Sequence, residues 1–238
     1  MSKRDVVVLG IARSAIGSFG GGLADIEPCE LAGTVMKEAI SRSGVDPKAI
    51  NYVTVGNTIP TESRFPYVAR VASIQAGLSQ ESVAMALNRL CSSGLQAIVT
   101  TAQNILLNDC DYGIGGGVEV MSRAGYLSAA MRNGARMGDS KMIDTMVSTL
   151  TDPFGVGHMG VTAENLATKW GITREEQDAL SVESHRRAGA GNWPRFANRT
   201  FALGWKRPPS FSSKAAISAF PRPRSKPWRP AQKVGFRA

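Results

Sequence analysis

The last fifty residues of the chain contain no aspartate or glutamate. Residues 189–238 hold eleven of the 28 lysines and arginines, which leaves 17 basic and 19 acidic residues in 1–188. The formal net charge of +9 therefore comes from the end of the chain, and the rest is close to neutral. Binding of nucleic acid or acidic partners through basic charge is thus a hypothesis for 189–238 alone.

Long apolar runs and cysteines are also scarce. No apolar run approaches the roughly 18 residues that cross a bilayer, so no membrane association is expected. The three cysteines, Cys29, Cys91 and Cys110, form no even disulfide framework and lack metal-ligand spacing, so no metal site is expected. The apolar run at 6–9 is too short for a signal-peptide core. Together these absences predict a cytoplasmic protein.

Short apolar runs alternate with helical patterns between residues 6 and 118. Strands are predicted at 6–11, 52–55, 82–87 and 111–118, and helices at 28–43, 66–76 and 95–106. This alternation predicts an α/β fold with a mostly parallel, mixed sheet flanked by helices. In such sheets chemistry gathers at the carboxyl ends of the strands.

Apolar spacing also predicts which parts of these elements are buried. The run at 82–87 is short and apolar, which predicts a buried strand. The set expected on the apolar face of the helix at 66–76 is Tyr67, Val71 and Ile74. The set expected on the apolar face of the helix at 95–106 is Leu95, Ile98, Val99, Ala102, Ile105 and Leu106.

Capping residues mark several helix ends. Pro28 suits the first turn of the first helix, and Gly44 suits its end. Thr162 is a candidate cap for a later helix, and Thr173 and Glu176 have the spacing of a capping box for the helix after it.

Cys91 lies where the strand at 82–87 turns into the helix at 95–106. Ser92 and Ser93 are capping-type residues, and Gly94 allows a sharp turn. The first amides of a helix carry partial positive charge, which favours a thiolate, the nucleophilic form of cysteine. The alternative is a small buried cysteine without chemical function. Residue types alone leave both interpretations open.

Residues 88–97 read Asn-Arg-Leu-Cys-Ser-Ser-Gly-Leu-Gln-Ala. This long segment resembles the acyl-accepting cysteine motif of the thiolases, the acetyl-CoA acetyltransferases and β-ketothiolases. Residues 13–22, 115–122 and 158–165 also resemble thiolase segments. The glycine-rich stretch at 13–22 lacks a dinucleotide or P-loop pattern, so it is predicted to be a turn with positive φ.

The resemblance implies half of a thiolase fold. Residues 1–122 would form the N-terminal α/β domain, and residues 123–188 would form part of the loop domain that covers the active site. Cys91 would take an acyl group from an acyl-CoA, and a deprotonated acetyl-CoA would then attack this thioester to give a 3-oxoacyl-CoA. The reverse reaction is thiolytic cleavage. Coenzyme A thioesters are the substrates, and no further cofactor is implied.

The resemblance also assigns supporting residues. His158 and Met159 would line the acyl and pantetheine pocket. In the glycine-rich segment at 115–122, Glu119 and Ser122 would be available to hydrogen-bond the nucleophile turn; the alternative is a glycine-rich loop with a solvated Glu119. His185, in the helix that follows Thr173, is expected to be a solvated helix residue.

Two acid/base segments of the thiolases do not occur in this sequence. Thiolases use a histidine in a Gly-His-Pro segment and a second cysteine in a Cys-Gly-Gly-Gly segment, and both belong to the C-terminal half. The resemblance therefore implies a truncated chain with little or no thiolase activity. An unpaired half should expose apolar surface and be poorly soluble. Intact family members are dimers or tetramers, so the intact protein is expected to be a homo-oligomer.

After Ala188 the resemblance stops. Seven of the twelve prolines follow it, and they are expected to exclude long helices and central strands. One interpretation of 189–238 is a frameshifted or erroneous reading, and the other is a genuine, disordered, basic extension. As an alternative function, this tail would bind nucleic acid or acidic partners. The aromatic residues interleaved with its basic ones are Trp193, Phe196, Phe201, Trp205 and Trp228.

Overall fold

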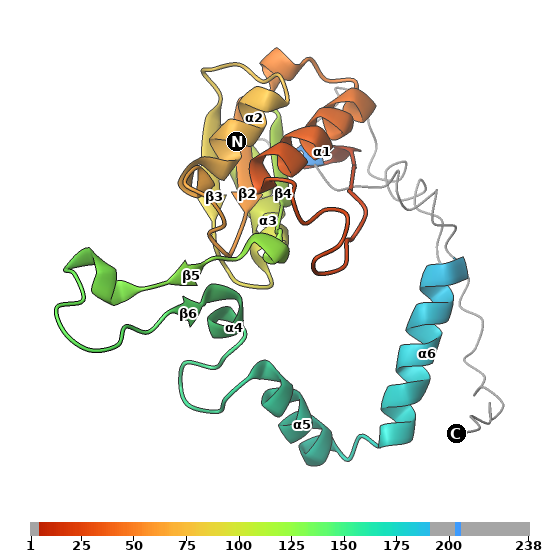
Figure 1. The fold of residues 1–238 in the computed structure, drawn as a ribbon. Helices are drawn as coiled ribbons and strands as arrows, with labels where there is room; N and C mark the ends of the chain where they lie inside the picture. The colour runs from red at the N-terminus through yellow and green to blue at the C-terminus, as the bar shows by residue number, and fades with distance from the viewer. Residues whose placement is uncertain (1–4, 191–202, 206–238) are drawn as a thin grey trace.

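A computed structural model describes residues 5–190 and a strand at 203–205 (Figure 1). A five-stranded sheet has the order β1-β7-β4-β2-β3. Its strands are β1 (Val8–Gly10), β2 (Tyr52–Gly56), β3 (Val83–Leu87), β4 (Gly113–Gly117) and β7 (Leu203–Trp205). β2 is parallel to both β3 and β4, whereas β7 is antiparallel to β1 and β4. The predicted mixed, mostly parallel sheet is confirmed.

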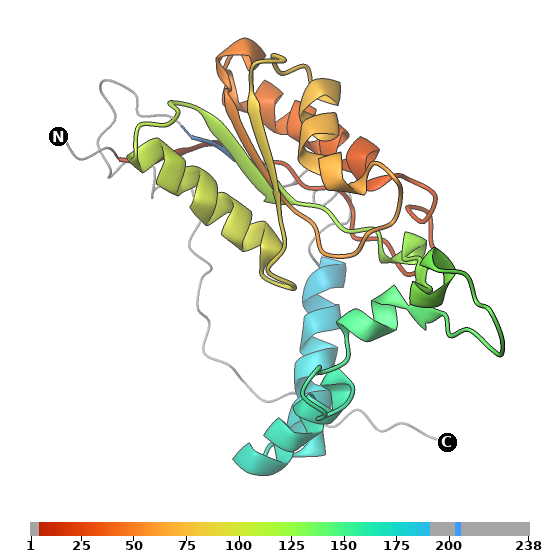
Figure 2. The same cartoon turned by 90° about the vertical axis from the view of Figure 1, so that its left-hand side faces the viewer.

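Helices cover both faces of this sheet, giving three layers (Figure 2). α1 (Pro28–Ser43) and α2 (Val68–Gln75) pack together on one face, and α3 (Ser93–Leu106) lies on β2 and β4 on the other. α1 has the predicted bounds, with Pro28 in its first turn and Gly44 left-handed at φ 69° after its end. Short 3₁₀ helices lie at Pro47–Ala49, Phe65–Tyr67, Met121–Arg123 and Ala129–Arg132.

The core lies between the sheet and the α1–α2 pair. Val53 and Val55 of β2 are at most 1% exposed, and they pack with Met36 of α1 and Ala72 of α2 in one buried cluster. Burial of apolar area here is the main favourable contribution to folding.

Two predictions about buried faces are wrong, one of them in part. β3 is an edge strand rather than a buried one, and its Val83 is 52% exposed. The prediction for the helix at 66–76 is wrong for Tyr67 and Ile74, which are exposed, whereas Val71 of α2 packs against the core and Ala69 and Ala72 are buried. The two helices approach closely at Gly33 of α1, where an added Cβ would lie 3.3 Å from Ala72 O of α2.

The prediction for the apolar face of α3 is only partly right: Ile105 is buried and Ile98 and Ala102 are half-buried, but the other three members of the predicted set are exposed. Ala97, Thr101 and Ile105 are buried, whereas the exposed apolar residues are Leu95, Val99 and Leu106. The reason lies in β4, because a Cβ added at Gly115 would lie 2.7 Å from the Cα of Ile98. The helix backbone therefore rests directly on a glycine strand, and the larger side chains of Leu95, Val99 and Leu106 remain exposed.

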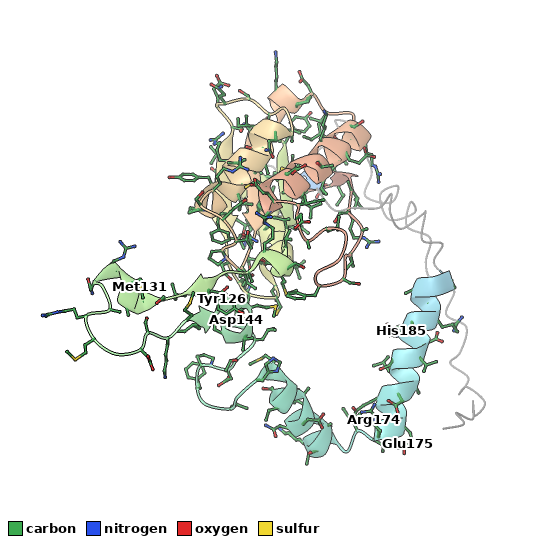
Figure 3. The ribbon with its side chains drawn as sticks, viewed as in Figure 1. Tyr126, Met131, Asp144, Arg174, Glu175 and His185 are labelled. Carbon is green, nitrogen blue, oxygen red and sulfur yellow. The ribbon has the colours of Figure 1, made fainter. Side chains whose placement is uncertain are left out.

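Residues 121–190 extend away from these layers (Figures 1 and 3). They contain β5 (Tyr126–Leu127), β6 (Ile143–Asp144), α4 (Thr145–Thr149), α5 (Met159–Trp170) and α6 (Arg174–Ala190). Tyr126 of β5 pairs with Asp144 of β6, and Figure 3 shows these side chains beside α4. We call residues 121–190 the excursion; no residue in it is buried.

Caps account for the helix ends of the excursion. The prediction that Thr162 caps α5 is wrong, because the cap is His158, whose Nδ1 accepts a hydrogen bond from Gly160 N at 3.0 Å. The capping box of α6 is confirmed: Glu176 N donates to Thr173 Oγ1 at 3.3 Å, and Thr173 N donates to Glu176 Oε2 at 3.0 Å.

Most of the basic tail lies outside the described residues. Its described strand, β7, is central to the sheet, so the expected exclusion of central strands is wrong for 203–205. Pro194 and Pro208 flank this stretch, and Leu203 to Trp205 therefore keep the backbone donors that a ladder requires. The frameshift, disorder and nucleic-acid predictions concern residues that the structure does not describe, and the predicted domain boundaries stay predictions.

Across the described ranges, no helix has the length and apolar character needed to traverse a bilayer. The same ranges hold no group of three or more histidine, cysteine, aspartate or glutamate side chains suited to a metal ion.

Candidate active site

A cleft of about 690 Å³ opens at the carboxyl ends of β2 and β4. Gly56 and Gly117 at these strand ends line it, together with Cys91 at the start of α3. The excursion contributes Met121, Thr149 and Leu150. The cleft therefore lies at the carboxyl ends of the strands, where functional sites of such sheets are expected.

Cys91 lies between the end of β3 at Leu87 and the start of α3 at Ser93, as predicted. It is exposed and lines the cleft, whereas Cys29 and Cys110 are buried. The alternative of a small buried cysteine is therefore wrong for Cys91. Cys91 thus precedes the cap residue Ser92, next to the positive end of the α3 dipole.

The residue before Cys91 has an unusual backbone. Leu90 has φ 49°, in the left-handed region that non-glycine residues seldom adopt. Its carbonyl oxygen accepts hydrogen bonds from Ser93 Oγ at 2.6 Å and from Ser93 N at 3.0 Å. The turn that presents Cys91 is thus closed by the first residue of α3.

Glu119 ties the loops after β2 and β4 together. Its carboxylate accepts hydrogen bonds from Thr58 N at 2.9 Å, Ile59 N at 3.1 Å and Asn57 Nδ2 at 3.0 Å. Burial raises the pKa of this carboxyl, although these hydrogen bonds oppose the shift. The expected bond to the nucleophile turn is indirect, because Thr58 Oγ1 in turn donates to Leu90 O at 3.2 Å.

Glycines allow α3 to lie against the strand ends. A Cβ at Gly56 would lie 2.4 Å from the carbonyl carbon of Ser93, and one at Gly117 would lie 2.9 Å from Gly94 Cα. Both contacts are with backbone atoms, which cannot move aside easily. Glycine is therefore needed at Gly56 and Gly117 because the backbones of the strand ends and of α3 approach closely beside Cys91.

The chain matches the family model "Thiolase, N-terminal domain" over residues 6–199. This chain belongs to the thiolase family. It is 52% identical over 187 residues to Beta-ketothiolase BktB of Cupriavidus necator, a match that covers 79% of this chain and 48% of the relative. An acetyl-CoA acetyltransferase of Chromobacterium violaceum is 46% identical over 187 residues, covering 78% of this chain and 47% of the relative.

Solved thiolase structures share the fold. A crystal structure of human mitochondrial 3-ketoacyl-CoA thiolase in complex with CoA matches with a TM-score of 0.79 at 34% identity. The match covers 83% of this chain and 51% of the human chain. This chain thus spans about half the length of the relatives that it matches.

His158 and Met159 lie next to the cleft of this thiolase without lining it. Met159 N donates to Leu150 O at 2.8 Å, and Leu150 does line the cleft. The predicted roles of His158 and Met159 in an acyl and pantetheine pocket stay predictions. His185 is an exposed residue of α6, far from the α/β layers in Figure 3, as expected for a solvated helix residue.

The other polar residues have structural partners. Ser122 Oγ accepts a hydrogen bond from Gly20 N at 2.9 Å, so it bonds the glycine-rich loop rather than the nucleophile turn. Gly20 has φ 67°, which confirms the predicted turn. Burial and the neighbouring Glu62 carboxylate raise the pKa of Cys29 to about 12, so this thiol stays protonated near neutrality.

Sequence reasoning missed Thr58 and the left-handed Leu90. Thr58 follows the carboxyl end of β2, and the rule about strand ends could have singled it out. The conformation of Leu90 had no sequence signal, because leucine is not a residue that favours positive φ.

Proposed function

We propose that this chain carries the acyl-accepting cysteine of a thiolase, and that Cys91 takes an acyl group from an acyl-CoA. The Cys91 thiolate attacks the thioester carbonyl carbon, the bond from that carbon to the coenzyme A sulfur breaks, and the leaving thiolate takes up a proton. The observation that carries the proposal is the exposed Cys91 in the cleft at the start of α3. The positive end of the helix dipole there favours the oxyanion that develops on the thioester carbonyl.

The cleft supports this substrate class. Its volume of about 690 Å³ lies within the range of roughly 300–1,000 Å³ typical of small-molecule sites. Apolar side chains on two sides of the cleft, Leu31 and Val35 of α1 and Leu150 of the excursion, suit an acyl or pantetheine chain. The transfer requires no metal or further cofactor.

We further propose that this chain by itself has little or no turnover in condensation or thiolysis. Carbon–carbon bond formation requires a base that removes a proton from the acetyl methyl group. The Gly-His-Pro and Cys-Gly-Gly-Gly segments expected to supply acid/base groups are not present in the sequence. Among the described residues, neither His158 nor His185 lines the cleft, and Cys29 and Cys110 are buried.

Mass spectrometry tests the acyl transfer. The full chain is incubated with acetyl-CoA and digested, and we expect an acetyl group on the Cys91 peptide and none on the peptides of Cys29 or Cys110. Cys91→Ala should abolish the label, and Cys110→Ala should retain it. If Cys91 reacts with iodoacetamide but never with acetyl-CoA, the acyl-acceptor role is wrong.

A turnover assay tests the second part of the proposal. Acetoacetyl-CoA thiolysis by the purified full chain should be near the background rate. Turnover close to that of an intact thiolase would contradict the incomplete-site account while leaving the acyl-acceptor role in place.

The alternative function, nucleic-acid or acidic-partner binding, rests on eleven basic and no acidic residues in 189–238. Such binding should weaken steeply with salt, because each neutralised phosphate releases counterions. If the full chain does not bind DNA, or binds it with no dependence on salt, this alternative function is excluded.

A further inference from the structure

Leu90 holds a conformation that its own side chain disfavours, immediately before Cys91. Its φ of 49° lies in the left-handed region, where an L-residue brings Cβ close to its carbonyl oxygen. Such conformations persist where surrounding contacts over-determine them, and they cluster at functional sites. The contacts that hold Leu90 can be identified in the hydrogen-bond network.

Three donors converge on the carbonyl oxygen of Leu90. Ser93 Oγ lies 2.6 Å away, Ser93 N 3.0 Å and Thr58 Oγ1 3.2 Å. On the other side of the same residue, Leu90 N donates to Asn88 Oδ1 at 2.8 Å. The peptide groups on both sides of the left-handed residue are therefore held.

Ser93 is central to this network. The residue is 4% exposed, and its Oγ also accepts a hydrogen bond from Arg89 N at 2.8 Å. One hydroxyl group thus bonds the chain on both sides of the Leu90 α-carbon. Thr58 Oγ1 lies 3.3 Å from the Ser93 Oγ. The backbone amide of Thr58 donates a hydrogen bond to the Glu119 carboxylate.

We propose that Ser93, assisted by Thr58, positions the Cys91 thiol by holding Leu90 in the left-handed conformation. The inference rests on the proposed acyl-acceptor role of Cys91. Ser93 and Thr58 are positioning residues because they act through Leu90. Release of Leu90 to negative φ would turn the chain at Cys91 and move its sulfur relative to the amides of α3.

Acylation and alkylation of Cys91 distinguish a change in the position of its sulfur from a change in its accessibility. Acyl transfer requires the sulfur and the thioester carbonyl in a defined geometry, and small displacements reduce such reactions strongly. Alkylation by iodoacetamide requires little more than an accessible thiolate. A positioning residue should therefore affect acylation far more than alkylation.

The test compares Ser93→Ala with Ser92→Ala in the full chain. Ser92 is adjacent, exposed and makes no side-chain cap bond to α3, so it is a matched control. In Ser93→Ala we expect the acetyl-CoA acylation rate of Cys91 to fall roughly tenfold or more. The alkylation rate should change less than about threefold, and both rates should be unchanged in Ser92→Ala.

The conformation of Leu90 is read separately by NMR. A left-handed residue gives a strong intraresidue NOE between its amide proton and Hα. This NOE should be strong in the unmodified chain and in Ser92→Ala, and weak in Ser93→Ala. Because glycine adopts positive φ without steric cost, adding Leu90→Gly to Ser93→Ala should recover part of the lost acylation rate.

The outcomes separate this inference from the proposed function. If Ser93→Ala retains the strong Leu90 NOE, the positioning role is wrong, whether or not Cys91 is acylated. If the unmodified chain is not acylated at Cys91, the proposed function fails, and the NOE still decides the inference. If Ser93→Ala does not fold, Thr58→Val removes the other hydroxyl and should weaken the same NOE; a strong NOE there would overturn the proposal.

Discussion

The α/β layers have a buried apolar core, whereas the excursion has none. Within residues 5–190, every buried apolar residue lies between Ala12 and Val120, and no residue between 121 and 190 is buried. In the excursion, Phe154 is 92% exposed and Trp170 71%. The layers are held by a core, whereas the helices of the excursion are held by local capping and propensity.

Both regions leave apolar side chains exposed to solvent. Large apolar residues remain exposed in the excursion and on the outer face of α3, where Leu95 is 66% and Leu106 50% exposed. These surfaces fit the expectation that an unpaired half of a thiolase exposes apolar area. Substitutions that have large effects in one region should therefore have small effects in the other.

The largest difference should come from truncating buried and exposed side chains. Ile114 of β4 is 1% exposed, so Ile114→Ala removes core contacts and should lower the free energy of unfolding by about 3 kcal/mol. Phe154→Ala should change it by less than about 0.5 kcal/mol. Urea unfolding of both variants measures the contrast, and comparable losses would show that the excursion shares the core.

Substitution of one glycine in each region, Gly115 in the layers and Gly125 in the excursion, should also affect stability differently. A Cβ at Gly115 would lie 2.7 Å from Ile98 Cα and 2.8 Å from Ala97 O, so Gly115→Ala should cost about 2 kcal/mol through displacement of α3. Gly125, in the excursion, has open space at the same position. Gly125→Ala should therefore be neutral within about 0.5 kcal/mol. Urea unfolding measures both; a neutral Gly115→Ala would disprove the close packing of α3 on β4.

Two carboxyl groups should give opposite pH slopes. Burial raises the pKa of Glu119 above 4.5, so the folded state holds its proton more tightly than the unfolded state. As pH rises from 4.5 through this raised pKa, the stability of the natural chain relative to Glu119→Gln should fall. Urea unfolding of both chains across this pH range measures the difference, and a rising difference would contradict the assignment.

In the excursion, hydrogen bonds from Arg186 and Arg187 lower the pKa of the half-buried Glu183 from 4.5 to about 2. Its contribution to α6 is therefore present above pH 4.5 and lost as pH falls towards 2. Far-UV circular dichroism should show α6 helicity declining in this range, less so at high salt. Glu183→Gln should remove this part of the pH dependence; an unchanged profile would count against the ion pairs.

The smallest expected effect concerns the cap of α6. Thr173→Ala removes half of the capping box and should destabilise this helix locally by about 1 kcal/mol. Because α6 buries no residue, the midpoint of global urea unfolding should stay unchanged while far-UV helicity decreases. Ser184→Ala, at an exposed position within α6, is the control. A shift of the global midpoint in Thr173→Ala would indicate that α6 stabilises the layers.

Element types and helix ends were largely predictable, whereas burial was not. Pro28, Gly44 and the Thr173–Glu176 box act locally, so their positions in the sequence were sufficient to predict them. The buried side of α3 depends on the glycines of β4, which come later in the chain and pack against the helix only in the folded sheet. The edge position of β3 likewise depends on strand order.

The sequence by itself determined the family and the place of Cys91 between a strand and a helix, because both follow from contiguous residues and their local propensities. Only the tertiary structure decided that Cys91 lines a cleft. It also decided that Glu119 is connected through Thr58 to the carbonyl oxygen of Leu90. It also decided that Leu90 is held left-handed. These features arise where three distant segments converge, and the hydrogen bonds between them form only after the sheet has brought their ends together.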